Sequence, residues 1–145
     1  MRIIDSHVHF PSPDLFGRPK GDVHPWVMQE QARWRKAWQF DRAEPLASQD
    51  ELVERWYKEA TKYDISVVFV TSGGNEVMSE IVKAHPDRFY GYAHHDPSLK
   101  DAPTLLEKSI REQGLKGYKI LGPAVDTPLD SKELYPVWEV AQGEN

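Results

Sequence analysis

The sequence predicts an α/β fold in which four parallel strands alternate with helices that cover their outer face. Two observations lead to this prediction. Apolar runs of strand length alternate four times with amphipathic stretches at helical spacing, an order typical of right-handed βαβ units. The run 65–71 is almost continuously apolar and rich in β-branched residues, as in a strand buried on both faces of a parallel sheet. No repeat or linker divides the chain, so residues 1–145 are expected to form one domain.

The first strand is expected at residues 2–9 and is followed by an insertion. Pro and Gly recur between residues 11 and 21 and indicate a loop. Apolar positions at helical spacing then predict a helix over 26–40, which carries Trp34 and Trp38 together with basic residues. This helix either buries its tryptophans as an ordinary amphipathic helix or serves as a lid or a subunit contact, because Trp and Arg are enriched at interfaces.

Helix and strand signals place the remaining elements. Ser48 and Glu51 form a capping box that opens a helix ending near Tyr63. The strand over 65–71 follows, and the turn after it offers Asn75 as the N-cap of the next helix. The later elements are expected in this order: that helix up to the residue before Pro86, a strand over 89–95, a helix over 101–113 closed by Gly114, a strand over 116–122 and a helix over 130–141.

Composition and charge narrow the function classes. The formal net charge is -5 and no block of basic residues occurs, which argues against a nucleic-acid or anionic-membrane partner. The sequence contains no cysteine, which excludes disulfides and thiolate ligands and fits a reducing compartment. The first residues lack the apolar core of a signal peptide, and the longest apolar run is too short to span a bilayer. We therefore expect a soluble, cytoplasmic protein.

An aspartate and two histidines close the first strand. Because side chains alternate faces along a strand, Asp5, His7 and His9 are expected to point to the same face. Neutral imidazole is the commonest protein ligand for Zn²⁺ and related ions, and a nearby carboxylate fixes its tautomer and orientation. The spacing therefore predicts a divalent-metal site, with zinc as the expected ion, His7 and His9 as ligands, and Asp5 orienting or assisting them.

The segment from Asp5 to His9 resembles the first-strand signature of the amidohydrolase superfamily, and the chain is similar to its amidohydrolase-2 group of metal-dependent hydrolases and decarboxylases. Segments 85–91, 114–120 and 134–138 also carry the resemblance. The family implies a TIM-like (β/α)8 barrel with the metal at the C-terminal face of the strands. Such a barrel typically needs ~250 residues, so this chain is expected to form half of one, with four parallel strands, outer helices and a helical insertion after strand 1.

The resemblance implies a metal-dependent hydrolase that acts on a carbonyl-containing small molecule through a metal-bound hydroxide. Decarboxylation of an aromatic acid occurs in the same group, and the sequence does not separate the two reactions. The family takes further metal ligands from a histidine after the fifth strand and an aspartate after the eighth, which four strands do not supply. A second hypothesis is therefore a half-barrel that associates with itself and binds metal without turnover.

Three further residues are candidates for the site. His94 and His95 end the third strand, so one of them is expected to face the barrel interior and to bind substrate or metal; the alternative is a polar rim. Lys119 lies on the fourth strand, where a buried lysine acts as a base in some enzymes. A lysine that reaches solvent or pairs with a carboxylate is the alternative. The predicted catalytic residues are thus Asp5 and Lys119, and His94 and His95 are the predicted substrate-binding residues.

The predicted partner is a second copy of the chain. Four strands of a barrel leave two sheet edges unpaired, one at strand 1 with Ile3 and one at strand 4 with Tyr118 and Ile120. We expect a homodimer in which two half-barrels meet edge to edge and rebuild eight strands. This dimer would place His7 and His9 of one copy opposite the same pair of the other copy, across the mouth of the barrel.

Overall fold

A computed structural model describes residues 2–10, 33, 48–71 and 73–143. The predicted loop over 11–21 and, apart from Arg33, the predicted helix over 26–40 lie outside the described residues, and so does the prediction of a lid or subunit contact there. In the part of the chain that is described, strands and helices alternate as the sequence predicts.

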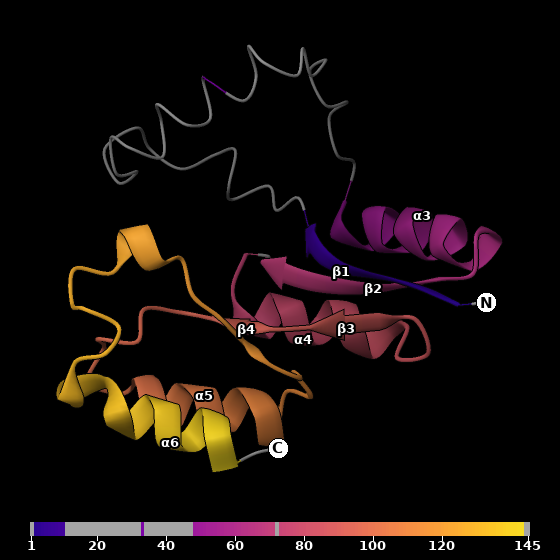
Figure 1. Ribbon diagram of the computed structural model, residues 1–145. Coiled ribbons are helices and arrows are strands. Elements are labelled where there is room, and N and C mark those ends of the chain that lie inside the picture. Colours follow the sequence, from indigo (N-terminus) through magenta and orange to yellow (C-terminus); the bar gives the residue numbers. More distant parts are fainter. Residues whose placement is uncertain (1, 11–32, 34–47, 72, 144–145) are drawn as a thin grey trace.

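Parallel strands form the centre of the structure (Figure 1). Strands β1 (Ile3–His9), β2 (Ile65–Thr71) and β3 (Phe89–Gly91) pair in that order. Strand β4 (Ala93–His94) pairs with β5 (Tyr118–Lys119) in a second, shorter ladder. Every one of these pairs is parallel, which confirms the α/β class with a parallel sheet.

The predicted third strand is divided into β3 and β4 at Tyr92. Its backbone still joins β2, because the Tyr92 N–H donates to the Phe69 carbonyl at 3.0 Å. Likewise, Lys116 N–H donates to the Gly91 carbonyl and Ala93 N–H to the Gly117 carbonyl, both at 2.8 Å. The two ladders therefore follow one another as a single curved layer.

Two predicted elements are shorter in the structure than the sequence indicates. The fourth strand, expected over 116–122, is regular only at β5, and a short 3-10 helix, η1 (Gly122–Ala124), follows it. The last helix, expected over 130–141, begins as a second 3-10 turn, η2 (Lys132–Leu134), and continues as α6 (Tyr135–Gly143).

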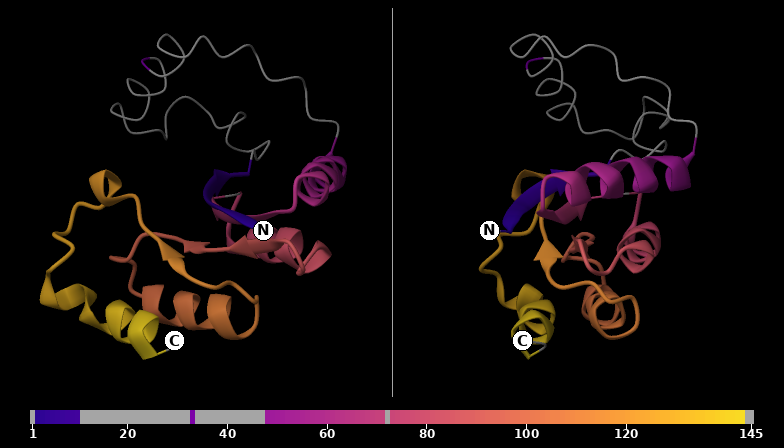
Figure 2. Two further views of the ribbon diagram at one scale, coloured as in Figure 1. Left: turned by 45° about the vertical axis from the view of Figure 1, so that its right-hand side comes forward. Right: turned by 90° about the vertical axis from the view of Figure 1, so that its right-hand side faces the viewer.

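The helices pack against the strands from one side, and α5 and α6 lie next to each other (Figure 2). They are α3 (Gln49–Lys62), α4 (Asn75–Ala84), α5 (Ala102–Arg111) and α6. Ser48 caps α3 as predicted, because its hydroxyl accepts the Glu51 N–H at 3.1 Å. Asn75 was wrongly predicted as the N-cap of α4. Gly74 occupies the cap, with φ at +141°, and Asn75 is the first helical residue.

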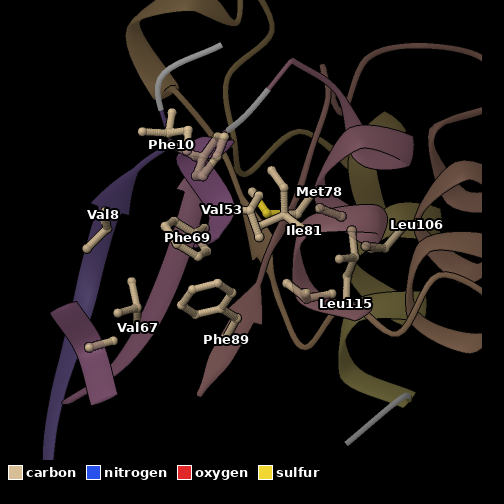
Figure 3. Packing of buried hydrophobic residues seen from close by; sticks show 14 of the residues in the cluster. Val8, Phe10, Val53, Val67, Phe69, Met78, Ile81, Phe89, Leu106 and Leu115 are labelled. Carbon is tan, nitrogen blue, oxygen red and sulfur yellow. The ribbon is translucent and has the colours of Figure 1, made fainter. Parts of the chain in front are cut away.

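Aromatic rings fill the space between the strands and the helices. Phe69 is fully buried, with Phe10 and Phe89 beside it (Figure 3). Its ring contacts Phe10, Trp56 and Phe89 edge to face, with ring centroids 5.4, 5.7 and 5.1 Å away. The alternate residues of β2, among them Val70, are also buried. This confirms the prediction of a strand buried on both faces.

Gly91 is the point of closest approach between the strands and α4. A Cβ atom at Gly91 would lie 2.6 Å from Met78 Cγ and 2.9 Å from Val82 Cγ1, well inside van der Waals contact. Gly91→Ala should therefore lower the free energy of unfolding by about 1–3 kcal/mol, the usual cost of overpacking a core. Chemical denaturation measures the loss. Gly122→Ala is the matched control, because a Cβ there meets its nearest atom, Leu129 Cδ1, at an ordinary 3.7 Å. An equal loss in both variants would contradict the packing argument.

Among the described helices, none has the length and apolar character that a membrane crossing requires.

Candidate metal centre

His7 and His9 occupy the end of β1 and face away from the helices. Val8 and Phe10, the residues that alternate with them, are only 8% and 1% exposed and belong to the core. The two histidines therefore lie on the opposite, concave side of the strand layer. The pairing of β1 with β2 is irregular between Asp5 and Val8 and again between Val8 and His9. This irregularity changes the local direction of β1 at the residues that carry the two imidazole rings.

The two imidazoles converge. Their Nε2 atoms lie 3.2 Å apart, and their ring centroids are 5.2 Å apart. Two nitrogen ligands at about 2.0–2.1 Å from a tetrahedral zinc ion stand about 3.3 Å from each other. The spacing of the His7 and His9 nitrogens thus fits two ligands of one ion without any movement of the backbone. In the absence of an ion, the same spacing suits a hydrogen bond with one ring as donor and the other as acceptor.

Asp5 contacts the backbone beside this pair. Its Oδ1 accepts the N–H of His7 at 3.3 Å, which ties the carboxylate to the irregular part of β1. A carboxylate so placed helps to fix the backbone from which the His7 ring projects. The register pairs Asp5 with the core residue Val67, so the irregularity of β1 leaves Asp5 on the helical face of the strand. The prediction that Asp5 shares a face with His7 and His9 is therefore wrong, and its catalytic role stays a prediction.

His94 and Lys119 stand at the ends of the neighbouring strands. The Nδ1–H of His94 donates to the Lys119 carbonyl at 2.8 Å, which leaves Nε2 of His94 without a proton when the ring is neutral. Burial lowers the pKa of His9, and the charges of His7, Lys119 and His94 lower it further. Those three side chains thus act electrostatically on His9, and they favour the neutral ring that a metal ion needs.

Asn75 joins this group from the start of α4. Its Oδ1 accepts the backbone N–H of His94 at 2.8 Å, and its Nδ2 donates to Ser109 Oγ at 3.0 Å and approaches His95 Nδ1 at 3.4 Å. One side chain therefore links β4, α4 and α5. In the sequence, Asn75 follows a turn at the C-terminal end of a strand, which is the available signal for this site. Its local pattern favours helix capping and does not reveal the contact with His94.

The side chain of His95 lies on the helical side of the layer. Its Nε2–H donates to the Ala102 carbonyl at 3.1 Å, and its ring lies against that of Tyr118 at 4.7 Å. Burial also raises the pKa of the Tyr118 phenol, whose O–H donates to the His95 carbonyl at 3.0 Å. Of the two adjacent histidines, His94 is thus the one on the side of His7 and His9. The substrate-binding role predicted for both stays a prediction.

The environment of His95 implies a pH dependence of stability. Burial lowers the pKa of His95 and outweighs the opposing effect of the hydrogen bond to Ala102; His94 lowers it as well, and Asp101 and Asp96 raise it. Because the folded pKa lies below the unfolded value of about 6.5, the stabilising contribution is complete above that value and is lost as the pH falls through the folded pKa.

Denaturation at a series of pH values should therefore show stability falling below neutral pH in the parent and less steeply in His95→Asn. His85→Asn is the control, since that histidine pairs with Glu54 at a nitrogen–oxygen distance of 2.6 Å and stacks on Tyr57. Parallel pH profiles for the parent and His95→Asn would contradict the assignment.

Two findings limit what this centre contains. Among the described residues, no three His, Cys, Asp or Glu side chains are grouped closely enough to hold an ion. A pocket of about 240 Å³ lies beside α5 and α6, lined by residues such as Lys100, Thr127 and Glu133, and none of the candidate residues lines it. The structure thus supplies a two-imidazole half-site on an open surface.

No protein-family model matches the chain, and no curated protein is similar to it in sequence at a significant level. Two solved structures share its fold. One is 5-carboxyvanillate decarboxylase from Novosphingobium aromaticivorans, with bound manganese and 3-methoxy-4-hydroxy-5-nitrobenzoic acid, at 16% identity and a TM-score of 0.64. The other is a probable 2-pyrone-4,6-dicarboxylic acid hydrolase from Acinetobacter baumannii with citric acid bound, at 16% identity and a TM-score of 0.60.

The alignments cover 99% of this chain but only 48% and 47% of those two proteins. The chain therefore spans about half the length of the solved structures that it matches. Both are barrel enzymes, so the likeness agrees with the predicted half-barrel fold.

Proposed function

We propose that the chain provides the metal-binding half of a metal-dependent hydrolase related to the amidohydrolases, acting on a carbonyl-containing small molecule. The observation that carries this proposal is the convergence of His7 Nε2 and His9 Nε2 to 3.2 Å at the C-terminal end of a parallel strand. The C-terminal ends of the strands are where active sites of barrel folds form. The manganese in one of the two similar structures supports a divalent ion, and the imidazole donors suit zinc.

His7 and His9 would hold the ion. When bound, a divalent ion polarises a carbonyl oxygen and makes water a stronger acid. The chain's own residues have separate tasks. Lys119 contributes a positive charge beside the histidines, which favours a negatively charged substrate group, and His94, with Nδ1 facing the Lys119 carbonyl, presents Nε2 as its free ring nitrogen for hydrogen bonding. Asp5 fixes the backbone at His7.

The absence of cysteine from the sequence supports our placing the protein in the cytoplasm.

The test is hydrolysis of a panel of esters, amides and lactones by protein supplied with Zn²⁺ or Mn²⁺, together with decarboxylation of aromatic acids. We expect metal-dependent turnover of at least one class, and its loss in His7→Ala/His9→Ala. His85→Ala is the matched control, because it removes a histidine on the helical side and should keep the activity. Turnover that survives the double substitution would refute the proposal.

A second candidate function is a half-barrel that associates with itself and binds metal without turnover. Among the described residues only two imidazoles converge, whereas a catalytic zinc site normally has three protein ligands and an open position. Metal binding without activity on any substrate of the panel would favour this second function.

A further inference from the structure

The two ends of the strand layer offer open edges in the described part of the chain, where β1 begins one ladder and β5 ends the other. Ile3 N–H donates to the Asp64 carbonyl, so the backbone of Ile3 faces β2, and that of Ile4 faces the open side. Ala93 N–H donates to the Gly117 carbonyl, so Tyr118, its partner in the ladder, turns its own N–H and C=O to the open side of β5.

Apolar side chains accompany these open edges. Ile3 and Ile4 on β1 are 51% and 65% exposed, and Leu121, just after β5, is 38% exposed. An exposed, apolar edge strand is a template for pairing with another chain. The partner of such an edge must present an open edge strand that can pair with it in parallel orientation.

The register of the strands shows which residues a second copy would bring together. His9 lies beside Thr71, and continuing the β2–β3 register by two residues places Thr71 beside Ala93, which pairs with Tyr118. In an eight-stranded barrel of shear 8, half a circuit shifts the register by about four residues. The residue that meets Tyr118 is then the one about four positions before His9, namely Asp5 of a second copy.

Charge supports the same pairing. The open edge of β1 carries the carboxylate of Asp5, whereas the edge at β5 carries the amines of Lys116 and Lys119. Opposite charges thus meet where the barrel register brings the two edges together. Two such contacts related by a two-fold axis would leave no open edge, which is the closed arrangement that symmetric dimers adopt.

We propose that β1 of one copy pairs with β5 of a second copy, and that the resulting two-fold dimer completes an eight-stranded barrel whose mouth contains His7 and His9 of both copies. In such a barrel, the first and fifth strand positions face each other. Each two-imidazole half-site then gains a second pair of nitrogen donors from across the mouth, which supplies the ligands that the described residues of one chain lack. The shared ion rests on the proposed function, whereas the pairing of the strands does not.

Sedimentation of metal-free protein at micromolar concentration tests the assembly, and we expect the mass of a dimer. A disulfide trap tests the register, because the parent sequence has no cysteine. Under oxidation, Ser6→Cys/Lys119→Cys should run as a covalent dimer on a non-reducing gel, because the register that pairs Asp5 with Tyr118 places Ser6 beside Lys119. The matched control, Ser6→Cys/Lys83→Cys, places the second thiol on the exposed face of α4 and should stay monomeric on the gel. A compact monomer in sedimentation, or equal cross-linking in both variants, would overturn the pairing.

Ile4→Pro provides an independent check, because proline removes the donor that faces the open edge without breaking a bond to β2. It should give a folded monomer. If Ile4→Pro remains a dimer, the interface lies elsewhere.

Metal titration separates the two proposals. One ion per dimer is the expected stoichiometry, and two ions per dimer would overturn the shared site. A dimer that does not respond to Zn²⁺ would refute the proposed function and leave the pairing intact. A monomer that binds Zn²⁺ through His7 and His9 would refute the pairing of the strands and leave the proposed function intact.

Discussion

Zinc should raise the midpoint of thermal unfolding of the parent protein and leave His7→Ala/His9→Ala unchanged. An ion that binds only the folded state stabilises it by mass action, by about 4 kcal/mol when its free concentration is 1,000 times Kd. For a domain of this size, that corresponds to roughly 8–16 °C. The double substitution removes both nitrogens that stand 3.2 Å apart, so no chelating pair remains on β1. Differential scanning fluorimetry with and without Zn²⁺ measures the shift.

The control for this experiment is His85→Ala. His85 stacks on Tyr57 with ring centroids 3.6 Å apart, so its loss should lower the starting midpoint while the zinc-induced shift stays. The zinc-induced change in the unfolding midpoint is therefore compared between variants, rather than the midpoint itself. This comparison separates metal binding from general stability. If the double variant responds to zinc as strongly as the parent does, the ion binds elsewhere and the metal centre is wrong.

The order of the elements was predictable from the sequence because it rests on local patterns. The apolar run of β2 and the cap at Ser48 both depend on neighbours in the chain, and both are confirmed. The half-barrel was not predictable from local patterns. It was predicted because the segment from Asp5 to His9 resembles the first-strand signature of the amidohydrolase superfamily. The structures that it matches, at 16% identity, support the fold and not the chemistry.

What the sequence did not reveal depends on tertiary contacts. Asn75 has the composition and position of a helix cap, and only the approach of β4 and α5 turns its side chain into a link between His94 and Ser109. The division of the third strand at Tyr92 has a similar origin. A Cβ at Gly117 would lie 2.8 Å from the Tyr92 ring, so this ring packs directly over the glycine of the neighbouring segment. No local pattern marks either contact.

The second large effect is expected from Phe69→Ala. This residue is fully buried, and three aromatic side chains contact its ring. Truncation of a buried phenylalanine typically costs about 3–5 kcal/mol, because transfer energy is lost and a cavity remains. One of the three neighbours is Phe10, which directly follows His9. Phe69→Ala should therefore also loosen the end of β1 and weaken zinc binding.

Leu106→Ala separates these two consequences. Leu106 is equally buried but belongs to α5, and its loss should cost about 2–5 kcal/mol. Because its cavity lies away from β1, the zinc affinity of the folded protein should stay near that of the parent. Chemical denaturation gives the stability of each variant, and calorimetric titration below the unfolding transition gives Kd. A larger Kd for Phe69→Ala than for Leu106→Ala would show that the aromatic core positions the histidine pair. Equal affinities would mean that β1 holds His7 and His9 in place without support from Phe69.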